Sequence, residues 1–451
     1  MAADLDTVFK AYDIRGTVPD QLDAELARGV GIAFARFADA PKVLVARDMR
    51  PSGVELSAAF IDGVTATGTD VVELGLASTD LLYFASGRLD APGAMFTASH
   101  NPAGYNGIKL CLSGARPVGE ESGLFEIKEA VRSGVSPPTT QRGRVTRREL
   151  IDEYAAHVRT FLGTRADALR PLRVVADTAN GMGGLVVPAV FADLPFDLEI
   201  LYGELDGTFP HHPADPIQPE NLRDLQALVL ERGADIGLAF DGDADRVFLV
   251  DERAQPVSGS LTTAMVAATM LDRTGPGPVI HNLICSKAVP EVIREHGGTP
   301  VRTRVGHSFI KATMADTGAV FGGEHSGHYY FRDFTQADSG VVPFLLMLEL
   351  ISKKGRRLSE ILAPLRAQYF ITGELNTPVP DVALKLQELK ERYAEARISH
   401  LDGISVDFDD WHFNVRPSNT EPLLRLNLEA RDRAACDAHV SEVLALIRGG
   451  T

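Results

Sequence analysis

The chain has 451 residues, which is more than one hydrophobic core ordinarily serves, so three or four domains are expected. Its net charge of -16 predicts a surface that repels nucleic acid and anionic membranes, and neither is expected as a partner. The N-terminus lacks a targeting pattern, no apolar run is long enough to span a bilayer, and three scattered cysteines are typical of a reducing environment. A soluble, cytoplasmic protein is therefore expected.

The first part of the chain alternates apolar strand patterns with a helical pattern. Strands are predicted at residues 42–46, 70–74 and 94–96, and a helix at 53–67. The third strand opens into Thr97-Ala98-Ser99-His100-Asn101-Pro102, followed by a turn-rich stretch that ends at Lys109. A serine at the mouth of a strand with His100 and Lys109 nearby is a candidate nucleophile. A turn with a satisfied histidine explains the same residues equally well.

The same rhythm returns and ends in an acidic loop. Strands are predicted at 173–176, 198–201 and 236–240, with helices at 182–192 and 221–232. The last strand opens into Asp241, Asp243 and Asp245, separated by Gly242 and Ala244 and followed by Arg246. In an extended segment this spacing places the three carboxylates on one side, where they repel each other unless a cation joins them. A hard divalent ion, Mg²⁺ by default, is expected.

The acidic loop has two alternative interpretations. An EF-hand calcium loop needs glycine at its sixth position, where Arg246 stands. A solvated acidic turn does not account for the flanking strands. Mg²⁺ usually completes its coordination with phosphate oxygens or water, and a phosphorylated Ser99 supplies such an oxygen. Arg246 and Lys109 can offset further charge on a transferring group.

A third round ends in a loop of mixed polar residues. Strands are predicted at 278–280, 301–304 and 319–321, with helices at 288–296 and 308–317. In the loop that follows, Glu324 and Ser326 can present a carboxylate and a hydroxyl to sugar hydroxyls, and His328 is an acid/base candidate. A metal site of the His/Glu kind is the alternative, but the spacing suggests no third ligand. His307 either joins this group or caps the helix that begins there.

Three related rounds predict an α/β fold with three similar domains, each a mostly parallel, mixed sheet with a polar loop after its last strand. Such loops, at the carboxyl ends of parallel strands, are where α/β sheets bind ligands. From about Pro364 the pattern changes to strands at 368–374, 404–408, 411–415 and 424–429, with helices at 382–396 and 433–447, which predicts an α+β domain. The expected domains are 1–150, 151–252, 253–364 and 365–451.

The C-terminal part carries a fourth polar loop that begins at Arg416. Its guanidinium, two hydroxyls, an amide and backbone N–H groups are typical of a site that holds a non-reacting phosphate. A hairpin turn uses the same residue types, and the motif alone favours that turn.

Taken together, the four loops make the sequence resemble the phosphohexomutase superfamily, most of all its bacterial phosphomannomutase/phosphoglucomutase branch. The match runs from Phe9-Lys10-Ala11-Tyr12-Asp13-Ile14-Arg15-Gly16 to the Arg416 loop, and four motifs in order are specific. The resemblance implies three α/β domains and a smaller α+β domain around a central cleft. It also implies reversible transfer of phosphate between the 1- and 6-positions of a hexose phosphate, through a phosphoserine and a hexose 1,6-bisphosphate that also serves as activator. A monomer or weak dimer is expected.

The resemblance also implies roles for particular residues. Ser99 would be the phosphoserine and would bind Mg²⁺ together with Asp241, Asp243 and Asp245. The residues that would read sugar hydroxyls are Glu324 and Ser326. The residues that would grip the substrate phosphate are Arg416, Ser418, Asn419 and Thr420. The other residues implied to line the cleft are Tyr12, Arg15, His100, Lys109, Arg246, His307 and His328. Lys109, His100 and His328 are candidates for the general base.

Two positions depart from the family pattern, and two other functions stay open. Ala244 stands where many members have glycine, and His325 stands where the best-known members have methionine, which leaves the sugar preference open. A phosphoglucosamine mutase shares the Ser, Asp and Arg loops, although the start of the chain and the residues around Glu324 favour the mannose/glucose branch. A non-catalytic sugar-phosphate-binding protein is the other alternative, against which the intact Ser99 and three aspartates argue.

Overall fold

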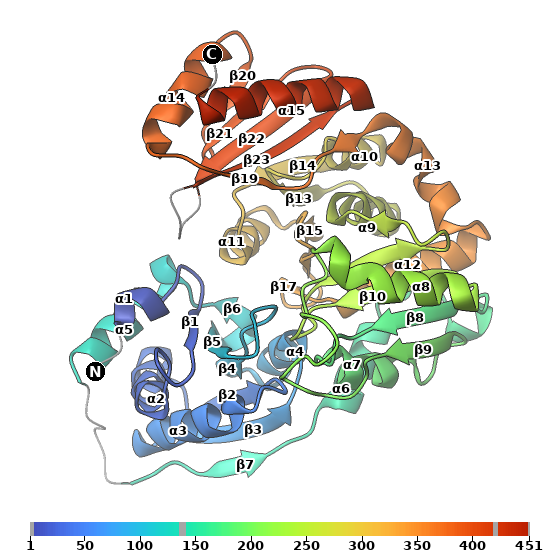
Figure 1. Ribbon diagram of the computed structural model, residues 1–451. Helices are drawn as coiled ribbons and strands as arrows, with labels where there is room; N and C mark the ends of the chain where they lie inside the picture. Colours follow the sequence, from blue (N-terminus) through green and yellow to red (C-terminus); the bar gives the residue numbers. More distant parts are fainter. Residues whose placement is uncertain (1–3, 135–140, 418–422, 450–451) are drawn as a thin grey trace. The chain divides into compact units, whose positions relative to one another are not determined.

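The computed structural model describes residues 4–134, 141–417 and 423–449. The chain divides into two compact units (Figure 1). Unit 1 comprises Met1–Ser258 and Ser326–Leu358, and unit 2 comprises Gly259–His325 and Ser359–Thr451. The segment predicted as a third domain is therefore shared between the two units.

Unit 1 begins with a mixed sheet in the strand order β1-β5-β4-β2-β3-β7, with β6 paired to β5. Its strands are β1 (Ile14–Thr17), β2 (Lys42–Arg47), β3 (Asp70–Leu76), β4 (Gly93–Phe96), β5 (Tyr105–Leu112), β6 (Arg116–Pro117) and β7 (Val145–Arg147). Its helices are α1 (Leu5–Val8), α2 (Ala24–Ala38), α3 (Ser52–Ala66), α4 (Thr79–Leu89) and α5 (Leu124–Arg132). Strand β4 runs parallel to β2 and antiparallel to β5, so the loop after β4 leaves the carboxyl end of a parallel pair.

Helices α2 and α3 pack backbone to backbone because glycines stand at their crossing. A Cβ atom on Gly63 would lie 2.2 Å from the carbonyl oxygen of Arg28, and one on Gly31 would lie 2.3 Å from that of Phe60. Any side chain at either position would push the two helices apart.

The second sheet of unit 1 has the order β12-β11-β10-β8-β9. Its strands are β8 (Arg173–Asp177), β9 (Asp197–Leu201), β10 (Ile236–Phe240), β11 (Val247–Asp251) and β12 (Pro256–Val257). The helices of this part are α6 (Ile151–Arg159), α7 (Gly183–Phe191) and α8 (Arg223–Arg232). Strand β10 is parallel to β8 and antiparallel to β11, which repeats the arrangement around β4.

The segment from residue 326 to 358 belongs to unit 1 through its apolar side chains. It contains β16 (Tyr329–Phe331), β17 (Ala337–Asp338) and α12 (Val341–Lys354). Phe344 of α12 packs with its ring centroid 5.6 Å from that of Phe191 in α7 and 5.8 Å from that of Phe240 in β10. Aromatic burial of this kind is a large apolar contribution to packing.

Unit 2 contains a parallel arrangement of β13 (Pro278–Asn282) with β14 (Thr299–Thr303) on one side and β15 (Phe321–Gly323) on the other. The helices of this part are α9 (Gly259–Thr274), α10 (Ala288–Glu295), α11 (His307–Thr317) and α13 (Leu358–Gln368). The C-terminal sheet has the order β18-β23-β22-β21-β20, with β19 paired to β23. Its strands are β18 (Phe370–Ile371), β19 (Leu375–Pro378), β20 (Arg397–Ser399), β21 (Ile404–Asp407), β22 (Trp411–Pro417) and β23 (Leu423–Ala430), and its helices are α14 (Val382–Arg392) and α15 (Arg433–Arg448).

The mixed α/β sheets and the C-terminal α+β sheet are as predicted, whereas the stretch around Pro364 differs. Pro364 lies inside α13, so the helix runs through the expected change of domain and on to Gln368. The strand expected at 368–374 is reduced to Phe370–Ile371. The buried side chains of Leu358 and Leu362 hold this helix in place, which offsets the hydrogen bond that proline cannot make.

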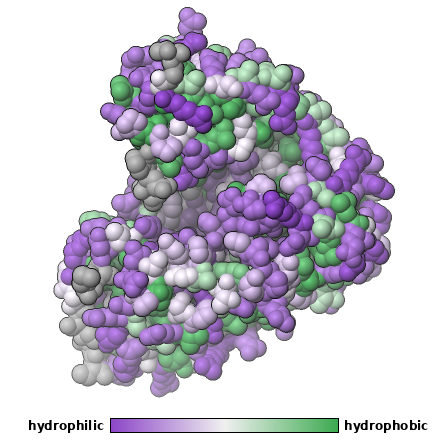
Figure 2. All heavy atoms as spheres, in the orientation of Figure 1, coloured by the Kyte–Doolittle hydropathy of each residue, from purple (hydrophilic) through white to green (hydrophobic). Residues whose placement is uncertain are grey.

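Hydrophilic residues cover most of the face drawn in Figure 2. Large exposed hydrophobic side chains occur at separate places in the sequence, among them Val54, Phe125, Leu230 and Leu384. In the part of the chain that the structure describes, no helix combines the length and the apolar character that a bilayer span requires.

Candidate active site

Ser99 lies in the loop that follows β4, in a conformation that few non-glycine residues adopt. Its φ angle is 49°, in the left-handed region, and its side chain is 5% exposed. The Oγ donates a hydrogen bond to Asp241 Oδ2 at 2.7 Å and lies 3.2 Å from His100 Nδ1. Arg246 Nη2 lies 3.4 Å from the same Oγ. The serine hydroxyl thus meets a carboxylate, an imidazole and a guanidinium at one point.

The acidic loop after β10 is a turn, so the prediction that an extended backbone aligns its carboxylates is wrong. The N–H of Ala244 bonds to the carbonyl of Asp241 at 3.2 Å, and Ala244 has a φ of 57°. The turn still brings one oxygen each of Asp241, Asp243 and Asp245 to within 4.8 Å of one another. Gly242 allows the loop to approach Ser99, because a Cβ there would lie 2.4 Å from the Ser99 carbonyl oxygen.

Two cations compensate the three buried carboxylates. Arg246 Nε donates to Asp241 Oδ2 at 2.8 Å, yet burial raises the pKa of Asp241 to about 7. Lys109 Nζ lies 2.7 Å from Asp243 Oδ2 and 2.6 Å from Asp245 Oδ2. Burial alone would lower the pKa of Lys109, but the two carboxylates raise it well above its ordinary value. The ammonium is therefore held in its charged form.

The chemistry of this cluster fits a metal ion. Among the residues that the structure describes, the buried atoms Asp243 Oδ1 and Asp245 Oδ1 accept no hydrogen bond. Such buried acceptors are costly unless something else satisfies them. Three carboxylates next to a serine hydroxyl form an all-oxygen donor set, which suits a hard divalent cation.

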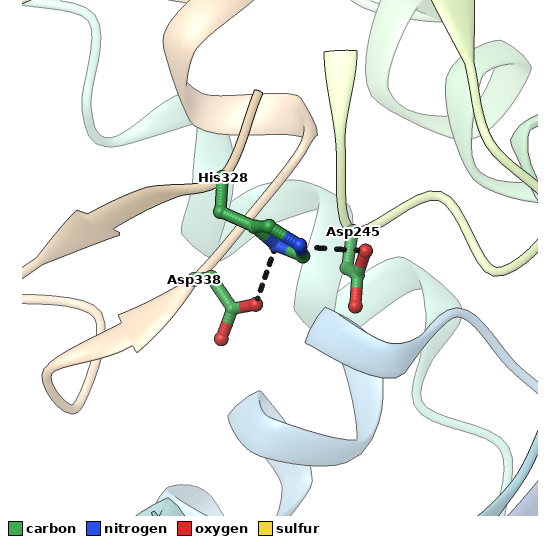
Figure 3. Close-up of side chains that lie close together, drawn as sticks. All are labelled: Asp245, His328 and Asp338. Atoms are coloured by element: carbon green, nitrogen blue, oxygen red, sulfur yellow. Dashed lines mark hydrogen bonds and ion pairs between the residues drawn. The ribbon is translucent and has the colours of Figure 1, made fainter. Parts of the chain in front are cut away.

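His328 lies between two carboxylates of unit 1, as Figure 3 shows. Its Nδ1 is 3.2 Å from Asp338 Oδ2 and 3.8 Å from Asp245 Oδ1. Burial alone would lower the pKa of His328, but these two carboxylates raise it. In contrast, Arg246, burial and Arg15 together lower the pKa of His100 well below its ordinary value. The two histidines near Ser99 therefore favour different protonation states.

Arg15 and Tyr12 come from the N-terminal segment of unit 1. Arg15 Nη1 donates to Asn101 Oδ1 at 2.7 Å, and its other terminal nitrogen pairs with Asp13. Arg15 thus contacts the Ser99 loop through Asn101. Tyr12 lies in the bend before β1 and is half-buried.

In unit 2, the predicted sugar-reading residue Glu324 already has partners. It is 2% exposed, and its Oε1 accepts hydrogen bonds from Asn282 Nδ2 at 3.0 Å and from the backbone N–H of Gly306 at 3.3 Å. His307 is the first residue of α11, and Gly306 takes the N-cap position instead of it. Ser326, the other predicted sugar reader, is half-buried and belongs to unit 1.

His325, one of the two departures from the family pattern, is accommodated by a hydrogen bond. Its Nδ1 lies 2.9 Å from Ser260 Oγ, and burial lowers its pKa. A methionine at this position would offer Ser260 only a weakly accepting thioether sulfur.

Arg416 lies on β22, where β23 pairs with it in an antiparallel hairpin. Its Nη2 donates to Glu374 Oε2 at 2.8 Å, and Arg425 Nη1 reaches the other oxygen of Glu374 at 3.2 Å. The guanidinium expected to hold phosphate is therefore paired with a carboxylate of the same unit. The other three predicted phosphate ligands, Ser418, Asn419 and Thr420, lie outside the described residues.

The sequence prediction missed several residues that shape the site. Asp48 and Arg50 form a pair that is wholly buried beside the Ser99 loop. Thr79 Oγ1 donates to Asp243 Oδ2 at 2.6 Å, and Asp338 contacts His328. Asp48 and Arg50 directly follow the buried strand β2, which is the same signal that identified the other loops.

Comparison with known proteins places successive parts of the chain in one set of families. Models described as phosphoglucomutase/phosphomannomutase alpha/beta/alpha domains I, II and III match residues 6–136, 152–255 and 258–369, and the C-terminal domain model matches 374–446. A relative named "Phosphohexose mutases", from Xanthomonas campestris pv. campestris, is 38% identical over 449 residues, covering 98% of this chain and 99% of the relative. A "Phosphomannomutase" from Salmonella montevideo is 36% identical over 452 residues, with the same coverage. The crystal structure of a phosphoglucomutase/phosphomannomutase family protein from Burkholderia thailandensis superposes with a TM-score of 0.90 at 31% identity, covering 100% of this chain and 99% of that one.

Proposed function

Because the chain belongs to the phosphoglucomutase/phosphomannomutase family, we propose that it is a phosphohexomutase, which transfers phosphate reversibly between the 1- and 6-positions of a hexose phosphate. One observation supports this most strongly: the Ser99 hydroxyl lies 2.7 Å from Asp241 in a cluster that also contains Asp243, Asp245 and the charged Lys109. A nucleophile beside paired acidic and basic groups is what phosphoryl transfer through a serine requires.

In this proposal Ser99 carries the phosphoryl group, and Asp241, Asp243 and Asp245 hold Mg²⁺ together with an oxygen of Ser99. When bound, the ion offsets the negative charge that phosphoserine brings next to the aspartates. Arg246 and Lys109, which already contact these groups, bind and orient the transferring phosphoryl group.

The proposed reaction has two transfers that mirror each other. The free hydroxyl of a hexose 1- or 6-phosphate attacks the phosphorus of phosphoserine 99, the bond from phosphorus to Oγ breaks, and the hydroxyl proton passes to a general base. The resulting hexose 1,6-bisphosphate turns over, and its other phosphoryl group returns to Ser99 Oγ. His100, Lys109 and His328 are the proposed candidates for the base. His100 lies 3.2 Å from Ser99 Oγ and has a lowered pKa, whereas Lys109 and His328, whose pKa values are raised, would first have to release a proton.

The remaining predicted residues are assigned to substrate binding. Glu324 and Ser326 read sugar hydroxyls, and Arg416 with Ser418, Asn419 and Thr420 holds the phosphate that does not react. Tyr12, Arg15 and His307 are proposed as further substrate-binding residues. We expect mannose and glucose phosphates both to react, hexose 1,6-bisphosphate to act as activator, and the protein to be a monomer or weak dimer.

A direct assay tests the function. The protein is incubated with mannose 1-phosphate, glucose 1-phosphate or glucosamine 6-phosphate, together with Mg²⁺ and a trace of the matching hexose 1,6-bisphosphate. Conversion of the first two to 6-phosphates is expected, with glucosamine phosphate reacting poorly. The highest kcat/KM for glucosamine 6-phosphate would instead identify a phosphoglucosamine mutase, and binding without any turnover would identify a non-catalytic binding protein.

A further inference from the structure

The buried guanidinium of Arg50 donates hydrogen bonds to four backbone carbonyls of the Ser99 loop. Arg50, in the loop after β2, has a side chain that is 0% exposed. Its Nη1 donates to the carbonyls of Pro102 at 2.8 Å and Tyr105 at 2.9 Å. Its Nη2 donates to the carbonyls of Ser99 at 2.9 Å and Asn101 at 2.6 Å. Every terminal N–H of this side chain is thus used on one loop.

Asp48 completes the arrangement from the other side of Ser99. Its carboxylate accepts the Nε–H of Arg50 at 3.2 Å and the backbone N–H of Arg50 at 2.9 Å. It also accepts a hydrogen bond from the Thr97 hydroxyl, whose oxygen in turn accepts the backbone N–H of Ser99 at 2.9 Å. The N–H and the C=O of Ser99 are therefore both held, directly or through Thr97, by the Asp48–Arg50 pair.

The pair is sealed from water and from the reacting atoms. The ring of Phe209 covers the guanidinium, with its centroid 5.0 Å from Arg50 Cζ. A Cβ on Gly207 would lie 2.5 Å from Arg50 Cα, so the segment carrying Phe209 also packs against the backbone here. Arg50 has no path to a substrate and acts only through the loop that it holds.

The held conformation needs such support. Ser99 has a left-handed φ of 49°, which is unfavourable for a residue with a Cβ, and four carbonyl oxygens that converge on one point repel one another without a cation. During turnover Ser99 alternates between a neutral hydroxyl and a phosphate dianion beside three aspartates. Without a rigid support, repulsion between the phosphate and the aspartates would displace the Oγ from its position beside Asp241.

We propose, on the basis of the function proposed above, that Arg50 and Asp48 are positioning residues that keep Ser99 Oγ aimed at the acidic loop in both states of the catalytic cycle. Their contribution is to the geometry of phosphoryl transfer and not to substrate binding. Small misplacements of a reacting atom cost about 10²-fold in rate. Loss of the support should therefore lower kcat and leave KM unchanged.

The test is Arg50→Lys, which keeps the positive charge but cannot hold four carbonyls. The kcat and the rate at which hexose 1,6-bisphosphate phosphorylates Ser99 should both fall by about 10²-fold, with KM within about threefold of wild type. Arg159→Lys is the matched control, because Arg159 also donates to two backbone carbonyls, those of Ala189 and Val190, away from Ser99. Its kcat should not change.

Thr97→Val keeps the proposal testable if Arg50→Lys does not fold. It removes the hydroxyl between Asp48 and the Ser99 N–H at nearly constant volume, and kcat should fall about tenfold at constant KM. Folded Arg50→Lys with wild-type kcat, or a kcat loss that only follows the folded fraction measured by thermal unfolding, would overturn the positioning role. Failure of the proposed function would show separately, as wild-type protein that never carries phosphate on Ser99.

Discussion

The groups proposed for phosphoryl transfer and those proposed for substrate recognition differ in their hydrogen-bond partners. In unit 1, the Ser99 hydroxyl bonds to Asp241, and Lys109 bonds to Asp243, so the transfer groups contact one another. In unit 2, Glu324 and Arg416 bond instead to residues with no role in the proposed reaction. The proposed transfer groups are thus preorganised within one unit, whereas a substrate bound by the proposed recognition groups would share or displace their existing partners.

The largest effect is expected from a substitution among the groups proposed for phosphoryl transfer. Ser99→Ala removes the covalent carrier, and turnover should fall by roughly 10⁴-fold or more while hexose phosphate still binds. Steady-state assays and calorimetric binding measure the two properties. Ser133→Ala, which replaces an exposed serine, is the control and should retain wild-type turnover and one phosphate in intact-mass analysis. Full turnover by Ser99→Ala would refute the assignment.

Removal of the proposed metal ion should have the next largest effect. Treatment with a chelator should abolish turnover, and added Mg²⁺ should restore it. Asp243→Asn removes a proposed ligand and the partner of Lys109, and kcat should fall roughly 10²- to 10³-fold. Asp235→Asn, at the other end of strand β10, preserves an acceptor for the Arg173 N–H and should have little effect. Equal activity of the two variants would exclude Asp243 from the site.

On the recognition side, Arg416→Ala should raise KM about ten- to hundredfold, because hydrogen bonds to a charged group contribute about 1.5–3 kcal/mol. Ser99 phosphorylation should persist, and more hexose bisphosphate should be released per turnover. Glu374→Gln keeps the shape of the partner but removes its charge, so KM should stay near or below the wild-type value. If Arg416→Ala changes neither KM nor bisphosphate release, the loop is only a hairpin turn.

The smallest expected effect is on the pH dependence of stability. It should have opposite directions for a buried histidine in unit 2 and a buried aspartate in unit 1. In unit 2, burial lowers the pKa of His281 to about 4, while the unfolded chain keeps its ordinary value of 6.5. Below pH 6.5 the unfolded chain binds a proton that the folded chain does not, so stability falls as the pH falls toward 4. His281→Asn removes this loss. The amount by which the unfolding free energy of the variant lies below that of wild type should therefore shrink by roughly 2 kcal/mol between pH 6.5 and 5.

Asp80 supplies the contrasting variant in unit 1. Burial raises its pKa to about 7 from an ordinary 3.8. Between these values the folded chain holds the extra proton, so stability rises as the pH falls. The deficit of Asp80→Asn relative to wild type should therefore grow between pH 7 and 5, where that of His281→Asn shrinks. Urea unfolding at both pH values measures the two changes. Deficits that both grow, or both shrink, as the pH falls would contradict the expected contrast between the two residues.

The sequence identifies the residues proposed for phosphoryl transfer, but it does not predict the conformation of the loops that carry them. Ser99 and the three aspartates are recognisable because polar residues follow buried strands at the carboxyl edge of a sheet. The left-handed φ angles of Ala244 and Ser99, and the close approach of Gly242 to the Ser99 carbonyl, belong to loops that lie far apart in the sequence, so local patterns do not encode them.

Two other features were not predicted, because they depend on contacts that form only in the folded chain. The position of Asp48 and Arg50 after a buried strand marks a candidate loop, but an arginine is ordinarily a surface residue, and the carbonyls that bind Arg50 lie about fifty positions later in the chain. Pro364 is ordinarily a helix terminator, but α13 continues through it to Gln368, and Leu358 and Leu362, which precede the proline in this helix, are buried.

Transfer of the phosphoryl group through Ser99 is tested most directly by following one labelled phosphoryl group. Protein phosphorylated with radiolabelled hexose 1,6-bisphosphate is mixed rapidly with unlabelled mannose 1-phosphate and Mg²⁺, and the reaction is quenched at successive times. Label is expected to leave Ser99 and to appear in hexose bisphosphate and then in monophosphate at a rate no slower than kcat. Label that stays on Ser99, or that leaves it more slowly than turnover proceeds, would contradict the phosphoserine relay.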